Sequence, residues 1–177
     1  MPDYELTKKA VEKLLKSLDL SGQGFEGTPE RVARMWEEFF KTEAPSLTIC
    51  ELKGELDMVM FRGHEFWSFC PHHLLPVKYK LTVAYIPHLK EVLGASKPLR
   101  VSDWVAGGLP LQEDIPALIF SGIRSEINLD GFACTIVGEH LCMRMRGVKS
   151  PCSEMIVPFF WGELKDEPGM SIFLKYA

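Results

Sequence analysis

The chain has 177 residues, of which 46% are hydrophobic and 25% charged, a balance typical of a globular protein rather than a disordered one. Its net charge of −4 gives no basic excess to neutralise phosphates, which excludes a general nucleic-acid-binding protein. No stretch reaches the roughly 18 to 20 apolar residues that span a bilayer, so we expect no membrane association. Five cysteines and a charged, amphipathic start, rather than a secretion signal, predict reduced thiols in the cytoplasm.

Two amphipathic helices are predicted first. The earlier one covers residues 4–18, with apolar side chains four positions apart: Leu6, Ala10, Leu14 and Leu18. Thr28-Pro29 suits the start of the second helix, as an N-cap residue followed by proline. Its apolar positions repeat with helical spacing: Val32, Met35, Trp36, Phe39 and Phe40. So large an apolar face needs a partner, either in the core or in another subunit.

The middle and end of the chain alternate between strand and helix patterns. Strands are predicted in order along the chain over Leu56–Phe61, Glu65–Cys70, Val77–Ile86, Phe132–Val137, His140–Val148 and Met155–Phe160, with a weaker one over Ile172–Tyr176. Arg62-Gly63-His64 is the expected turn of the first hairpin. Helices are predicted over Ser96–Ala106 and from about Gln112 to Leu129. This order indicates an α+β fold with a mainly antiparallel sheet.

No repeat or linker divides the sequence, so we expect one domain over residues 1–177. Within it, residues 1–45 form a helical segment and residues 46–177 form the sheet-containing core.

Two short segments hold five of the ten cysteine and histidine residues: Cys70-Pro71-His72-His73 and His140-Leu141-Cys142. Thiolates and imidazoles are the ligands that Zn²⁺ prefers in proteins. Residues two apart in a strand face the same side. A strand over 140–148 therefore predicts one shared face for His140, Cys142, Arg144 and Arg146. Such a face suits an anionic ligand held beside a metal ion.

Cys70 and His73 are three residues apart across a proline-containing turn, a spacing that lets both reach one ion. With Cys142 they would give three ligands, as in catalytic zinc sites that leave a fourth position for water. His72 and His140 would then flank the metal and move protons near neutral pH. A fourth ligand from His140 or His72 would instead close the site as a structural one. Spacing leaves both interpretations open, and ferrous iron remains an alternative to zinc.

A third segment, Gly94-Ala95-Ser96-Lys97-Pro98-Leu99-Arg100, places a hydroxyl and two cationic groups at a helix N-terminus. Free backbone N–H groups make such a position suitable for phosphate, although Ser-Lys-Pro is also an ordinary helix start. Gln112-Glu113 at the head of the next helix would by itself indicate only a carboxylate favoured by the helix dipole.

Taken together, these segments resemble the GTP cyclohydrolase I family over roughly residues 28 to 150. The matching pieces stand in the family's order: Thr28-Pro29-Glu30-Arg31-Val32-Ala33, Cys70-Pro71-His72-His73, Val83-Ala84-Tyr85-Ile86-Pro87, Gly94-Ala95-Ser96-Lys97 with Arg100, Gln112-Glu113, and Glu139-His140-Leu141-Cys142-Met143 running to Met145-Arg146-Gly147-Val148. The resemblance implies the tunnelling fold (T-fold), an antiparallel sheet with helices on one face. It also implies a homo-oligomeric barrel of five subunits. Two such pentamers stack into a decamer, with active sites at subunit interfaces.

The resemblance also implies a role for each matching residue. Cys70, His73 and Cys142 match the zinc ligands, and His72 and His140 match the catalytic histidines. Ser96, Lys97, Arg100 and Arg146 match residues that hold the triphosphate, and Gln112 and Glu113 match the pair that recognises guanine. The expected reaction is zinc-dependent hydrolysis of GTP at C8 to 7,8-dihydroneopterin triphosphate and formate. The product would serve folate, tetrahydrobiopterin or deazaguanine synthesis.

Three features depart from the family pattern: Pro71, Asp114, and residues 150–162, which lack the usual threonine-rich run. They leave two alternative functions. One is another T-fold enzyme acting on a purine or pterin, and the other is a non-catalytic, zinc-stabilised T-fold protein.

Overall fold

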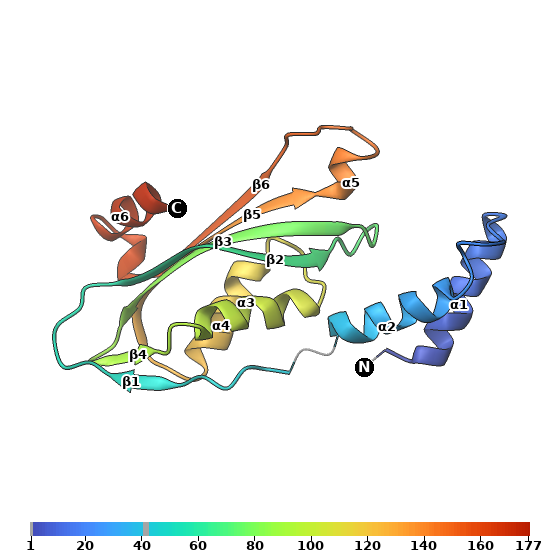
Figure 1. Ribbon diagram of the computed structural model, residues 1–177. Helices are drawn as coiled ribbons and strands as arrows, with labels where there is room; N and C mark the ends of the chain where they lie inside the picture. Colours follow the sequence, from blue (N-terminus) through green and yellow to red (C-terminus); the bar gives the residue numbers. More distant parts are fainter. Residues whose placement is uncertain (1, 41–42) are drawn as a thin grey trace. The chain divides into compact units, whose positions relative to one another are not determined.

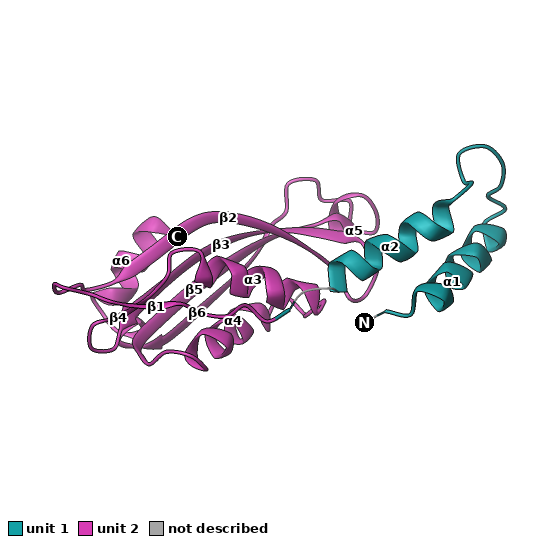
Figure 2. Cartoon of the chain, turned by 60° about the horizontal axis from the view of Figure 1, so that its bottom comes forward, with its two compact units in different colours: residues 1–43 teal, residues 44–177 magenta. Residues whose placement is uncertain are grey.

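Two units make up the chain in the computed structural model, Met1–Glu43 and Ala44–Ala177 (Figure 2), and the structure describes residues 2–40 and 43–177. The division falls close to residue 45, where the sequence predicts the end of the helical segment. Among the described residues, no helix is both long enough and apolar enough to cross a bilayer.

The first unit is a pair of helices, α1 (Tyr4–Ser17) and α2 (Thr28–Phe40), as predicted. Asp3 caps α1 by accepting a hydrogen bond from the backbone N–H of Leu6 at 2.8 Å. Lys8 on α1 forms an ion pair with Glu30 on α2 at 2.7 Å. Large apolar side chains of α1, including Leu6, are nevertheless exposed. The two helices therefore bury little apolar surface against each other.

The second unit contains a four-stranded antiparallel sheet in the order β2-β3-β5-β6 (Figure 1). These strands are β2 (Val59–Phe69), β3 (Pro76–Pro87), β5 (Leu129–His140) and β6 (Met155–Gly162). A two-stranded sheet pairs β1 (Ile49–Glu51) with β4 (Glu91–Leu93). The helical elements of this unit are α3 (Lys97–Gly107), α4 (Ile115–Arg124), α5 (Leu141–Arg144), the 3₁₀ helix η1 (Glu163–Lys165) and α6 (Gly169–Tyr176).

The main core lies between the sheet and the helices α3 and α4. Alternate residues of β3 point into it and are fully buried: Val77, Tyr79, Leu81, Val83 and Tyr85. Isoleucines four apart on α4 meet them and are equally buried: Ile115, Ile119 and Ile123. Burying a side chain of this size contributes roughly 1.5–3 kcal/mol. The apolar residues that build this core thus recur every second position in β3 and every fourth position in α4, as the sequence pattern predicted.

A smaller core lies on the other face of the sheet. Ala84 of β3 and Ala133 of β5 pack there with Leu164 of η1 and Phe173 of α6. In Figure 1, α6 lies on the opposite side of the sheet from α3 and α4. The expectation of helices on one face is therefore incomplete, because the C-terminal helix covers part of the second face.

The predicted hairpin at Arg62-Gly63-His64 is wrong, because β2 is one continuous strand. Its pairing with β3 shifts register between Arg62 and His64, and Gly63 has φ +78°. Only glycine adopts this conformation without steric cost. An extra glycine in a strand therefore produces a bulge here rather than a reversal of the chain.

The predicted strands Phe132–Val137 and His140–Val148 are also wrong in their limits. A single strand, β5, runs through Gly138 and ends at His140, and the next residues form the short helix α5. The strand predicted over Ile172–Tyr176 is wrong as well, because this segment belongs to α6, which buries Phe173. The helix predicted over Gln112–Leu129 is shorter, Ile115–Arg124, and Leu129 already begins β5.

A candidate metal centre

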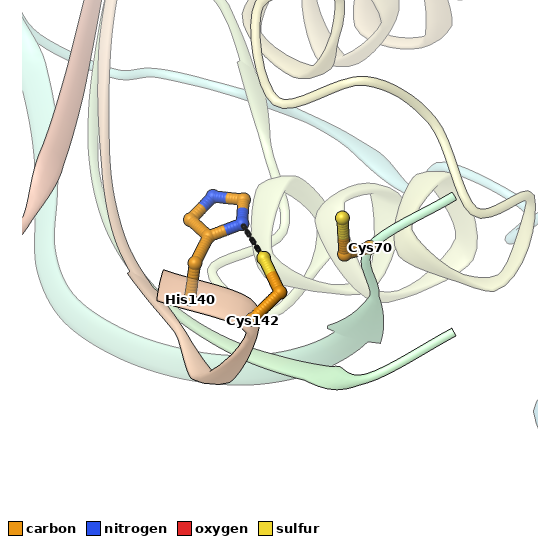
Figure 3. A group of neighbouring side chains, drawn as sticks. All are labelled: Cys70, His140 and Cys142. Carbon is orange, nitrogen blue, oxygen red and sulfur yellow. Dashed lines mark hydrogen bonds between the residues drawn. The ribbon is translucent and has the colours of Figure 1, made fainter. Parts of the chain in front are cut away.

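Cys70, His140 and Cys142 come together at one end of the four-stranded sheet (Figure 3). Their ligand atoms, two Sγ and one imidazole nitrogen, all lie within 4.8 Å of one another. The strand register explains this convergence. Ser68 of β2 pairs with Val77 of β3, which pairs with His140 of β5. Cys70 and Cys142 each follow this row by two residues, so they meet just beyond the end of the sheet.

The turn after β2 places two more imidazoles beside Cys70. The carbonyl of Cys70 accepts hydrogen bonds from the backbone N–H groups of His73 at 3.2 Å and Leu74 at 2.8 Å. Pro71 takes the second position of this turn, where its fixed φ is favourable. The Nδ1 atoms of His72 and His73 each lie 3.7 Å from the Sγ of Cys70. All four members of the first sequence motif therefore take part in one compact turn.

The imidazole of His140 is held between Cys142 and Gln112. Its Nδ1 lies 4.0 Å from the Sγ of Cys142, and its Nε2 lies 2.7 Å from the Oε1 of Gln112. Burial lowers the pKa of His140, an effect that the nearby carboxylate of Glu113 partly opposes. The lowered pKa favours the neutral ring, in which one nitrogen has a free lone pair.

Both thiols are buried, with Cys70 4% and Cys142 8% exposed. Burial raises the pKa of Cys142, and the neighbouring Cys70 raises it further. A divalent cation would reverse this effect, because it stabilises the thiolate form of both residues. Two thiols and a neutral imidazole within one ion's reach are a donor set that fits Zn²⁺ or Fe²⁺.

The two arginines expected on the face of His140 and Cys142 are separated in the structure. Since α5 turns the chain after His140, strand alternation does not apply to residues 141–144. Arg144 forms an ion pair with Glu139. The exposed Arg146 donates a hydrogen bond from Nη1 to the Nε2 of His73 at 3.1 Å. Only Arg146 of this pair therefore extends the candidate metal centre with a cationic group.

The predicted guanine-recognition pair splits into one exposed and one buried side chain. Glu113 is exposed and close enough to His140 to affect its pKa. Gln112 is 2% exposed, and all its polar atoms bond within the chain. A guanine contact from the amide of Gln112 would have to compete with these bonds.

The predicted phosphate segment lies away from the metal centre within one chain. Ser96, Lys97 and Arg100 occupy the N-terminal end of α3, where the ammonium of Lys97 donates to the carbonyl of Ser46 at 2.7 Å. Near the other end of α3, the hydroxyl of Ser68 donates to the carbonyl of Ala106 at 2.8 Å, two residues before Cys70. An 11-residue helix spans about 16 Å. The described residues of one chain therefore do not bring these two groups together.

We expect the five free cysteines to fall into three reactivity classes. Cys50 and Cys152 are exposed and should react at once with a thiol reagent in the folded, metal-free protein. Cys134 is buried, and burial raises the pKa of its thiol, so it should react only on unfolding. Cys70 and Cys142 should react slowly without metal and become protected by Zn²⁺. Mass spectrometry of the labelled peptides measures each class, and reaction of Cys70 and Cys142 at an unchanged rate in the presence of Zn²⁺ would contradict the proposed site.

Comparison with known proteins places these features in a family context. The family model of GTP cyclohydrolase I matches residues 7–175. GTP cyclohydrolase 1 of Aquifex aeolicus (strain VF5) is 38% identical, over 98% of this chain and 96% of that protein. The same-named protein of Sulfurihydrogenibium sp. (strain YO3AOP1) is 40% identical, over 84% of this chain and 81% of that protein.

A solved structure, the archaeosine synthase QueF-Like in the apo form, is a more distant match. It has a TM-score of 0.47 and 15% identity, over 62% of this chain and 97% of that one. Similarity at this level supports no argument about function.

Proposed function

Since the chain belongs to the GTP cyclohydrolase I family, we infer that it hydrolyses GTP to 7,8-dihydroneopterin triphosphate and formate. The observation that carries this inference is the convergence of Cys70, His140 and Cys142 at the end of the sheet. Such a donor set by itself would also suit a structural metal. The imidazoles and the guanidinium around it, which a structural site does not need, favour a catalytic one.

The ligand set that we propose is Cys70, His73 and Cys142, with His73 in place of His140, the imidazole of the converging group. The two Sγ atoms lie within 4.8 Å of each other, and the Nδ1 of His73 lies 3.7 Å from the Sγ of Cys70. Zn²⁺ held there would act as a Lewis acid that lowers the pKa of a coordinated water. The thiols must be reduced to bind the ion, which is consistent with a reducing compartment such as the cytoplasm.

His140 and His72 are the proposed proton-transfer residues. The neutral ring of His140 has its Nδ1 directed toward the metal centre, where it can accept a proton and deliver it to N7 of guanine. His72 is exposed beside Cys70, so it can exchange protons with solvent during ring opening and release of C8 as formate. Their separate surroundings suit two separate proton transfers.

The triphosphate is proposed to bind Ser96, Lys97, Arg100 and Arg146. Arg146 lies at the metal centre, whereas the other three lie at the far end of α3. The separation of these residues within one chain supports the homo-oligomeric barrel implied by the family, because a second copy of the chain would bring its α3 N-terminus to this metal centre. We propose that the triphosphate site is completed across this subunit interface.

Replacing Glu113 with glutamine should weaken selection of guanine. The carboxylate is the exposed acidic group beside His140 and suits the N–H donors of guanine. Losing a charge-assisted hydrogen bond should reduce kcat/KM for GTP by about 10- to 100-fold, mainly through KM. Steady-state kinetics measure this effect, and Glu126→Gln is the control because Glu126 is also exposed and lies in another turn. An unchanged KM for GTP would contradict this role.

The proposed function is tested directly with purified, zinc-loaded protein and GTP. Oxidation of the product should give pterin fluorescence, and formate should appear in equal amount. Absence of both products would exclude the proposed reaction and favour a non-catalytic protein. Formate without a fluorescent pterin would indicate that the chain opens the ring without closing the new one.

A further inference from the structure

The side-chain amide of Gln112 is buried and makes three hydrogen bonds. Its Nε2 donates to the carbonyl of Ile136 in β5 at 3.1 Å and to the carbonyl of Met155 in β6 at 2.8 Å. Its Oε1 lies 2.7 Å from the Nε2 of His140. Both N–H groups of the amide are thus used by backbone carbonyls, and the oxygen by an imidazole.

These partners determine the orientation of the amide and the protonation of His140. Turning the amide over would place Oε1 against two carbonyl oxygens, which cannot donate hydrogen bonds. Oxygen therefore faces the imidazole, and the Nε2 of His140 must carry the hydrogen. In the neutral ring Nδ1 is then the nitrogen with the free lone pair, and it faces the thiol of Cys142.

Gly138 provides the space in which this amide lies. A Cβ atom at position 138 would lie 2.2 Å from the Oε1 of Gln112 and 2.9 Å from a ring carbon of Tyr79. No side chain could be accommodated there without displacing Gln112. Glycine in the interior of a strand often marks such a close approach.

We propose that Gln112 is a positioning residue that holds His140 with its hydrogen on Nε2 and its Nδ1 lone pair toward the metal centre. Gly138 acts with it by leaving room for the amide. This inference deepens the proposed function, on which its kinetic consequences rest, and it differs from a role for the Gln112 side chain in binding guanine. A positioning role lowers kcat, whereas a substrate contact raises KM.

A variant of Gln112 separates positioning from a structural role. Gln112→Met keeps the volume but loses all three hydrogen bonds. In zinc-loaded protein labelled with ¹⁵N-histidine, solid-state ¹⁵N NMR reports which ring nitrogen carries hydrogen. The signal of His140 is identified by its loss in His140→Gln. Gly138→Ala should reproduce Gln112→Met, because the added methyl displaces the same amide.

The expected result is an Nε2–H ring for His140 in the wild type, and mixed tautomers in Gln112→Met and Gly138→Ala. The kcat should fall about 10- to 100-fold in Gln112→Met and Gly138→Ala, with KM for GTP changed less than kcat. Gly131→Ala is the control, since its added Cβ crowds Ile86 and Leu164 at the other end of β5. It should leave the His140 signal unchanged.

Two results would overturn the proposal: an unchanged His140 tautomer in Gln112→Met, or a raised KM with kcat preserved. If the wild type showed no GTP turnover, the proposed function would fail, but the NMR signals would still decide the role of Gln112. Thermal unfolding of each variant identifies any that fails to fold, and the remaining variants carry the comparison.

Discussion

Replacing Cys142 with alanine is expected to abolish both metal binding and GTP turnover. Cys142 lies in α5 immediately after β5, and its Sγ belongs to the group whose ligand atoms lie within 4.8 Å of one another. Without it, the remaining thiol and imidazole cannot enclose a Zn²⁺ ion, which protein sites normally hold with at least three ligands. Zinc content should fall from about one ion per chain to almost none.

The accompanying loss in kcat/KM should exceed about 100-fold, the upper range for residues that only support a ligand. Metal content is measured by atomic emission and turnover by pterin fluorescence. Cys134→Ala is a control matched for burial, because Cys134 is fully buried in the main core away from the site. It should lower the temperature of unfolding without loss of zinc. Full zinc retention in Cys142→Ala would rule out Cys142 as a ligand.

Replacing His140 and His73 in turn should separate proton transfer from metal binding. His140→Ala should keep zinc and lose about 10²- to 10⁴-fold in kcat, the range for a general acid–base residue. His73→Ala should lose zinc and turnover together, because we propose His73 as the third ligand. The comparison follows from the geometry, since His140 lies beside Cys142, whereas His73 lies beside Cys70, as does His72.

His88→Ala is the control for this pair, because His88 is an exposed histidine that bonds to Asp130 outside the site. Its zinc content and kcat should match the wild type. Release of zinc by His140→Ala, with retention in His73→Ala, would reverse the two assignments. Release by both variants would indicate a closed site with four protein ligands.

The sequence predicted the core elements where hydrophobic periodicity is strong. The strand Val77–Ile86 and the helix Ser96–Ala106 correspond to β3 and α3, because an apolar face buried by tertiary packing shows directly in the spacing. It failed where glycine has two interpretations. Gly63 was predicted to lie in a turn but forms a bulge, and Gly138 lies between two predicted strands but belongs to the single strand β5, where it makes room for Gln112. Only the tertiary neighbours distinguish these cases.

The two Cys/His segments meet in the structure, as the sequence predicted, but partly for a different reason. Strand alternation brought His140 and Cys142 together, whereas the structure does so with a turn into α5. Strand alternation also predicted that Arg144 lies at the site. In the structure Arg144 instead forms an ion pair with Glu139. The hydrogen bond of Gln112 to His140 was not predicted, since it joins residues 28 apart in sequence. The glycine at 138 was the one local signal of that contact.

The hydrogen bond from Gln112 to Met155 connects the metal centre to β6, which lies in the segment that departs most from the family pattern. Because the acceptor is a backbone carbonyl, it is present whichever residue occupies position 155. Substitutions that leave the backbone of this edge strand in place therefore keep the acceptor for Gln112. An insertion or deletion that slides β6 along β5 would instead move the carbonyl away from Gln112. The metal centre thus tolerates substitutions in β6 but is sensitive to a change in the length of the segment that contains β6.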